Sequence, residues 1–213
     1  MFKISITLLI IFALQTAMAE KKYSLTDLEA LQKSNSWKEL LEHIEDVVPA
    51  KRDKKWNEIL NTALEKGLDD FIKKDHSYEL QFFTRRFMDR YPQAQKNSQL
   101  SFRVAKAVRK KVSDTKAIKY FLWGLSKNPT KQQCSDEDLK LSVISSMNLS
   151  QKSDSAKFAK KVAFGPCFSE LKSTIKDAIN TSKNGMSNGC QGMIQHKALK
   201  GATAGKCKDY LKK

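Results

Sequence analysis

Apolar residues recur at intervals of three and four along most of the chain, which is the spacing of one buried helix face. Ser or Asp residues precede many of these runs, and helix starts are expected near positions 36, 53, 77, 98, 114, 135, 153 and 166. No strand-like alternation interrupts the pattern. The sequence therefore predicts an all-α fold, an array of antiparallel helices that is either an α-solenoid or a more compact bundle.

Three local patterns refine this prediction. A capping box over Thr26–Glu29 is expected to open the first helix, because Thr accepts from the first turn and Glu reaches back. Gly67 is expected to end the helix that begins at Asp53. A helix from Ser77 carries aromatic residues that are expected to face the core rather than to form a stacking platform: Tyr78, Phe82, Phe83, Phe87 and Tyr91.

The first 19 residues have the pattern of a signal peptide. Lys3 precedes an apolar run, Ile4–Leu14, and small residues at Ala17 and Ala19 suit cleavage before Glu20. The run is too short for a membrane anchor, which needs about 20 apolar residues. We therefore expect an exported protein, periplasmic or secreted, with a helical-repeat domain over 20–182 and a C-terminal cap over 183–213.

The four cysteines all lie in the C-terminal half, and an even number in an exported chain favours disulfides. Cys134 and Cys167 each precede a helix and lie 33 positions apart, the length of one helix-turn-helix unit in a stacked repeat. The starts of alternate helices lie side by side in such a stack, so these two are expected to pair. Cys190 and Cys207 would then close the cap. Zinc is the alternative, although zinc sites favour closely spaced pairs.

Residues 36–179 resemble the helical-repeat superfamily of tetratricopeptide and HEAT type, without the tetratricopeptide consensus residues. The segment containing Pro49, Arg52 and Trp56, together with the spaced cysteines, resembles exported helical proteins of Gram-negative bacteria. These resemblances imply a stacked helical fold and assign no site residue.

The formal net charge of the chain is +16, and removal of Lys3 with the leader would leave +15. Positive charge gathers at 51–55, at Arg85, Arg86 and Arg90, and on one further predicted helix. The buried face of that helix is expected to consist of Phe102, Ala105, Val108 and Val112. The candidate anion-binding face consists of the cations of that helix: Arg103, Lys106, Arg109, Lys110 and Lys111. None has a carboxylate partner four residues later within the same helix. The alternative is a solvated surface without a ligand.

No catalytic or nucleotide-binding motif is present, and the three histidines, His43, His76 and His196, lie in different segments. We therefore expect a binding or scaffolding protein with no cofactor, no metal site and no catalytic residue. Its partner would be an acidic protein or an anionic envelope polymer, whereas nucleic acid is less expected for an exported chain. The alternative function is an envelope-acting hydrolase or an inhibitor of one.

Export makes one direct prediction. Protein recovered from the periplasm or the medium should begin at Glu20, because the small residues before it suit signal peptidase. Intact mass spectrometry would measure this, and recovery of a chain that still begins at Met1 would contradict both the compartment and the argument for disulfides.

Overall fold

The structure, a computed structural model, describes residues 22–73, 77–125, 128–147, 154–181, 187–198 and 201–211. The predicted signal peptide, residues 1–19, lies outside them. These described residues form helices and turns without a strand, which confirms the all-α prediction. In the same ranges, no helix combines the length and the apolar character needed to span a lipid bilayer.

The chain divides into two compact units, Met1–Ala63 and Leu64–Lys213, and the boundary falls within helix α4 (Lys54–Lys73). The first unit also contains α2 (Leu25–Lys33), α3 (Trp37–His43) and the short 3-10 turns η1 (Ile44–Asp46) and η2 (Pro49–Lys51). The second unit contains all the later elements, including the segment after residue 182 that was expected to form a separate cap.

A Trp and an Arg organise the core of the first unit. The indole of Trp56 is 2% exposed and donates to the carbonyl of Ile44 at 3.0 Å. The guanidinium of Arg52 lies 4.8 Å from the Trp56 ring centre and donates to the carbonyl of Val47 at 2.8 Å. Arg52 therefore satisfies backbone acceptors that the turn after α3 leaves unpaired.

The second unit follows α4 with α5 (Ser77–Phe83), the π-helical turn η3 (Thr84–Met88), α6 (Pro92–Lys96), α7 (Ser98–Lys111) and α8 (Asp114–Gly124). The short α9 (Lys131–Cys134) leads into α10 (Glu137–Met147), α11 (Asp154–Phe164) and α12 (Phe168–Thr181). The last two helices are α13 (Ser187–Gln195) and α14 (Gly201–Leu211).

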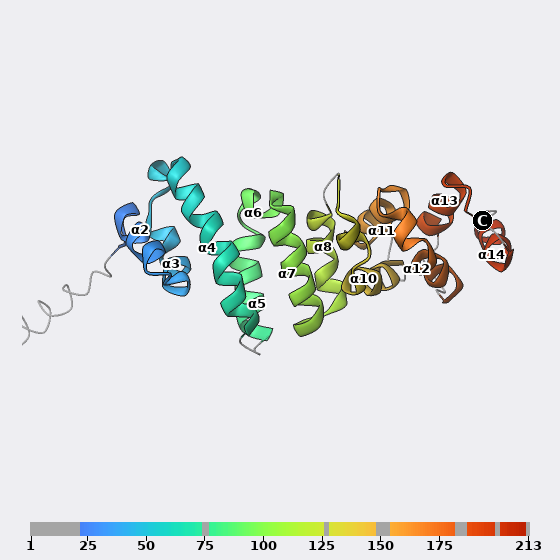
Figure 1. Cartoon of the computed structure of the whole chain (residues 1–213), viewed down its shortest axis with the longest axis horizontal. Helices are drawn as coiled ribbons and strands as arrows, with labels where there is room; N and C mark the ends of the chain where they lie inside the picture. Colours follow the sequence, from blue (N-terminus) through green and yellow to red (C-terminus); the bar gives the residue numbers. More distant parts are fainter. Residues whose placement is uncertain are drawn as a thin grey trace, which may run out of the picture. The chain divides into compact units, whose positions relative to one another are not determined.

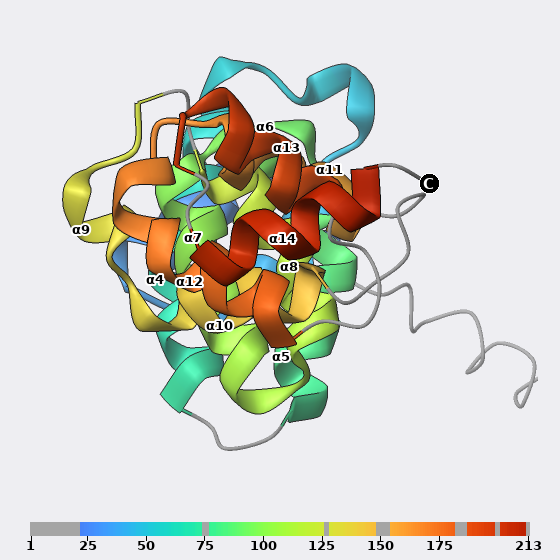
Figure 2. The same cartoon turned by 90° about the vertical axis from the view of Figure 1, so that its right-hand side faces the viewer.

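These helices pack as two rows. Helices α7, α10, α12 and α14 contact one another in that order, and α8, α11 and α13 form a second row beside them (Figure 1). In Figure 2 the same helices stand one behind another, with α14 nearest the viewer. Each helix contacts its sequence neighbour in the other row and the next helix in its own row. This is the packing of stacked helical repeats, so the second unit is solenoid-like.

Most expected helix starts are confirmed within two residues because the caps are local. Asn97 accepts from Leu100 N at 3.0 Å to open α7, and Ser113 accepts from Lys116 N at 3.1 Å to open α8. The expected capping box over Thr26–Glu29 was wrong, because the box that opens α2 is formed by Ser24 and Asp27. Ser24 has an extended backbone, which allows its side chain to reach the first turn.

Two further expectations were wrong. Helix α4 does not end at Gly67 but continues to Lys73, because Leu68 and Phe71 extend its buried face and Gly67 itself is buried. The expected aromatic helix is interrupted by η3. Phe83, Phe87 and Tyr91 are buried as expected, whereas Tyr78 is 76% exposed and Phe82 39% exposed.

Both predicted disulfides are confirmed. Cys134, at the end of α9, bonds Cys167, which directly precedes α12, with their Cα atoms 5.1 Å apart. Cys190 in α13 bonds Cys207 in α14 with a Cα separation of 5.4 Å. All four side chains are buried. The first bond therefore ties the entry to α10 to the start of α12, its neighbour in the same row.

Replacing both Cys134 and Cys167 with Ser should lower the free energy of unfolding by about 3 kcal/mol, because the bond restricts a loop of 33 residues in the unfolded chain. Urea unfolding of the oxidised mature chain would measure this. Peptide mapping without reduction provides the control, and a Cys167–Cys190 peptide would contradict the pairing.

Candidate binding surface on helix α7

Helix α7 buries the apolar face that the sequence predicted, with one exception. Phe102, Ala105 and Val108 are buried, whereas Val112, at the C-terminal end, is only half-buried. Leu100 and Val104 also lie in the core. The cations therefore occupy the rest of the helix surface, where they contact groups of neighbouring helices.

The cations at the two ends of the candidate face bind groups of α4. The guanidinium of Arg103 forms an ion pair with Asp69 and donates to the carbonyl of Glu65 at 3.4 Å. The ammonium of Lys111 donates to the carbonyl of Ile72. Asp69, in the C-terminal half of α4, thus serves as the ion-pair partner of Arg103.

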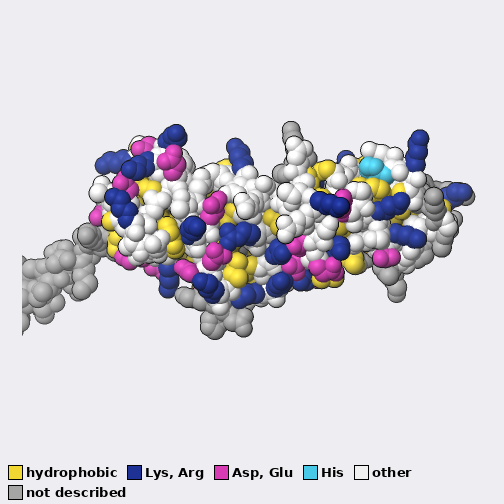
Figure 3. Space-filling model, in the orientation of Figure 1, with side chains coloured by type: hydrophobic (Ala, Val, Ile, Leu, Met, Phe, Trp, Pro, Cys, Tyr) yellow, Lys and Arg dark blue, Asp and Glu magenta, His cyan; other side chains and the backbone are white. Residues whose placement is uncertain are grey.

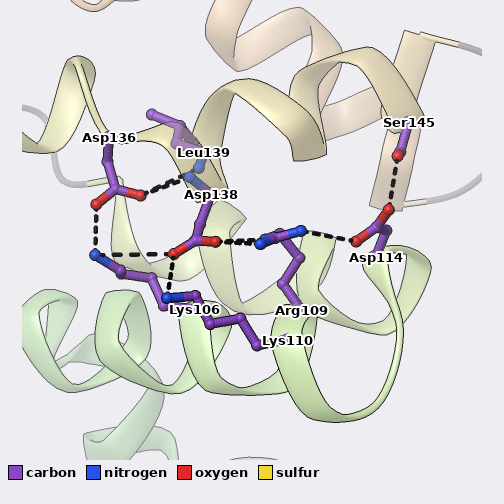
Figure 4. Close-up of polar contacts among 8 residues, drawn as sticks. All are labelled: Lys106, Arg109, Lys110, Asp114, Asp136, Asp138, Leu139 and Ser145. Carbon is purple, nitrogen blue, oxygen red and sulfur yellow. Dashed lines mark hydrogen bonds and ion pairs between the residues drawn. The ribbon is translucent and has the colours of Figure 1, made fainter.

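The three cations between them converge on the start of α10 (Figure 4). Arg109 Nε donates to Asp138 Oδ1 at 2.6 Å, and Lys110 Nζ lies 3.5 Å from Asp138 Oδ2. Lys106 Nζ donates to Asp136 Oδ2 at 2.6 Å and lies 3.9 Å from Asp138 Oδ2. The other oxygen of Asp136 caps α10 by accepting from Asp138 N at 3.0 Å.

Because the Asp138 carboxylate is buried, its negative charge must be stabilised by these cations. Its side chain is 8% exposed and that of Arg109 is 18% exposed, whereas Lys110 is 60% exposed. A carboxylate removed from water needs both opposite charge and hydrogen bonds to offset its lost hydration. The ion pairs therefore hold α7 against α10. These cations have no carboxylate partner within their own helix, and they pair instead with carboxylates of other helices.

Figure 3 agrees with this local picture, since Lys and Arg side chains on the visible face are interspersed with Asp and Glu. That α7 binds an anion stays a prediction. Most partners that the structure assigns to its cations lie 28 to 39 positions away in sequence, so inspection of neighbouring turns could not have found them. The exception is Asp114, which lies 3.6 Å from Arg109 and only five positions after it.

A groove of about 650 Å³ lies beside the N-terminal half of α7, and Arg103 and Lys106 line it. Helix α9 and the residues before it supply the other side. The remaining side chains are mostly polar and uncharged: Ser98, Gln99, Asn128, Thr130, Gln132 and Gln133, with Phe102 and Asp136.

The amide side chains of this groove are the feature that sequence reasoning missed. Gln99, Asn128 and Gln132 are exposed, and each carries both a donor and an acceptor. Gln133 is committed to the capping box of α9, where its side chain accepts from Thr130 N at 2.9 Å. The sequence signal was the polar run directly before Cys134, a residue that the disulfide anchors.

The histidines do not form a shared site in the described chain. His43 Nδ1 lies 2.9 Å from a carboxylate oxygen of Asp46, and its ring stacks on Tyr23 with centroids 3.9 Å apart. His196 stacks on Phe168 at 3.9 Å, and His76 lies outside the described residues. Within those ranges no cluster of His, Cys, Asp and Glu has the arrangement of a metal site.

Comparisons of the chain with protein-family models, with curated proteins and with solved structures gave no match.

Replacing Asp138 with Asn should lower the free energy of unfolding by about 3 kcal/mol, because three cations would surround a neutral buried group. Asp154→Asn is the matched control. Asp154 also lies in a first helical turn, but its pair with Lys157 is exposed and contributes about 1 kcal/mol or less. Urea unfolding would measure both, and equal losses would contradict a structural role for the Asp138 pairs.

Proposed function

We propose that this protein is an exported helical-repeat binding protein whose groove beside α7 takes an acidic segment of a partner protein. Two features support export: the N-terminal signal pattern and the two disulfides. The groove of about 650 Å³ is the observation that carries the binding role. Its volume lies in the range of ordinary ligand sites, roughly 300 to 1,000 Å³.

The chemistry of the groove favours an extended peptide. A peptide backbone presents alternating donors and acceptors, and the exposed amides of Gln99, Asn128 and Gln132 can satisfy both. Arg103 pairs with Asp69 of α4 and Lys106 with Asp136, yet the lining itself carries two cations and one carboxylate. This excess of one positive charge favours acidic side chains. A net charge of +16 for the whole chain would assist the approach of such a partner.

Stacking ligands fit this groove less well. Phe102 is the only aromatic residue among its described lining, and it is 7% exposed, so it offers little ring surface to a sugar or a base. This argues for a protein partner over an anionic polysaccharide or a nucleic acid.

The groove also supports binding over hydrolysis. Acid–base hydrolysis of a glycoside uses two carboxyl groups that face the scissile bond. The described lining has one carboxylate, Asp136, and its two oxygens are occupied by Lys106 and by the first turn of α10.

Replacing Gln99 and Gln132 with Ala should weaken binding of the mature chain to poly-L-glutamate about tenfold, because two hydrogen bonds of roughly 0.5 to 1.5 kcal/mol each are lost. Calorimetric titration would measure this. Binding by the wild type should also weaken as salt rises through about 0.15 M.

Gln191→Ala with Gln195→Ala is the control, since both side chains are exposed on α13, outside the groove. An Arg103→Gln variant tests charge, because its pair with Asp69 is partly exposed and its loss should cost about 1 kcal/mol of stability or less. Equal binding by the groove variant and the control would contradict the proposal. Tighter binding of polygalacturonate than of poly-L-glutamate would show that the partner is a polysaccharide.

A further inference from the structure

The turn η3 is an unusual piece of backbone in the second unit. Asp89 N donates to the carbonyl of Thr84, five residues earlier, at 2.9 Å, where an α-helix would use a residue four earlier. The wide turn is compatible with the core, since Phe83, Phe87 and Met88 remain buried. Single π-helical turns of this kind occur frequently at functional sites.

A cavity of about 140 Å³ adjoins this turn. Side chains of η3 and its flanks line it together with residues of α8, and the C-terminal end of α7 supplies an apolar wall. Its volume is below that of sites for drug-sized ligands. The polar lining consists of Gln81, Thr84, Arg85, Asp89, Lys116, Lys119 and Tyr120.

One part of this lining is satisfied internally. Lys119 Nζ donates to Asp89 Oδ2 at 2.7 Å, and the Tyr120 hydroxyl donates to Asp89 Oδ1 at 3.2 Å. Burial raises the pKa of Tyr120, so its phenol stays neutral and remains a donor. Burial alone would lower the pKa of Lys119, but the bonds to Asp89 and Tyr120 outweigh it and raise that pKa, so Lys119 stays charged. The negative charge of Asp89 is therefore balanced by Lys119 within the cavity.

Two cations of the lining have no carboxylate partner among the described residues. Arg85 is exposed and forms neither an ion pair nor a side-chain hydrogen bond there. Lys116 Nζ donates to the neutral amide oxygen of Gln81 at 2.9 Å. The candidate cations of α7, by contrast, all bind carboxylates or carbonyls. The cavity therefore holds two positive charges beyond the Lys119–Asp89 pair.

We propose that this cavity binds a small oxyanion, a phosphate or carboxylate group, between Arg85 and Lys116. A guanidinium presents a planar fork of N–H donors that matches the oxygens of such a group, and an ammonium adds a second charge. The apolar wall formed by Val108 and Val112 limits competing water on one side. The site shares no lining residue with the groove beside α7, so the two can be tested separately.

Phosphate binding to the mature chain can be measured by calorimetry and by ³¹P NMR line broadening, at constant ionic strength. Replacing Arg85 and Lys116 with Gln should raise the Kd for inorganic phosphate about tenfold or more, because two charge-assisted contacts are lost. Lys66→Gln with Lys96→Gln is the control, since it removes the same charge from exposed positions outside the cavity. This control should bind phosphate like the wild type.

Comparison of inorganic phosphate with phenyl phosphate and acetate distinguishes the sources of the oxyanion. Tighter binding of phenyl phosphate would indicate a phosphate ester, and tighter binding of acetate a carboxylate. The proposal is overturned if none of the three binds, or if the cavity variant and the control lose affinity equally. Circular dichroism of both variants checks that each retains the helical fold.

Discussion

The buried carboxylate of Asp138 is the interaction on which the second unit depends. It lies in the first turn of α10, where the helix dipole favours negative charge, and Arg109, Lys106 and Lys110 approach it from α7. Van der Waals packing between two helices tolerates several registers. A buried charge does not, because it needs its partners within a few ångströms. The Asp138 pairs therefore select one register of α7 against α10.

The disulfide between Cys134 and Cys167 acts on the same segment from the other side. Cys134 lies two positions before Asp136, so the entry to α10 is held to α7 by Lys106 and to α12 by a covalent bond. The groove beside α7 has this doubly held segment as one wall. A binding surface that is already ordered loses less conformational entropy when its ligand arrives, which is consistent with the binding role that we propose.

The distribution of charge shows why net charge is a coarse guide to function. The cations of α7 looked like a free basic face, yet the structure uses them to hold helices together. Arg85 and Lys116 belong to separate helical segments, and the fold brings them to one cavity without a carboxylate for either. The number of cations in the sequence therefore says less about ligand binding than the partners that the folded chain gives to each of them.

The sequence by itself determined the helical class, most helix starts and both disulfides. Helix periodicity and caps such as Asn97 and Ser113 act within four residues, and the repeat length places Cys134 beside Cys167. Only the tertiary structure decided that Asp138 pairs with Lys106, Arg109 and Lys110, that α4 continues through Gly67, and that a cavity lies between η3 and α8. These features depend on which helix faces meet and in which register, and that information is absent from any local stretch of the chain.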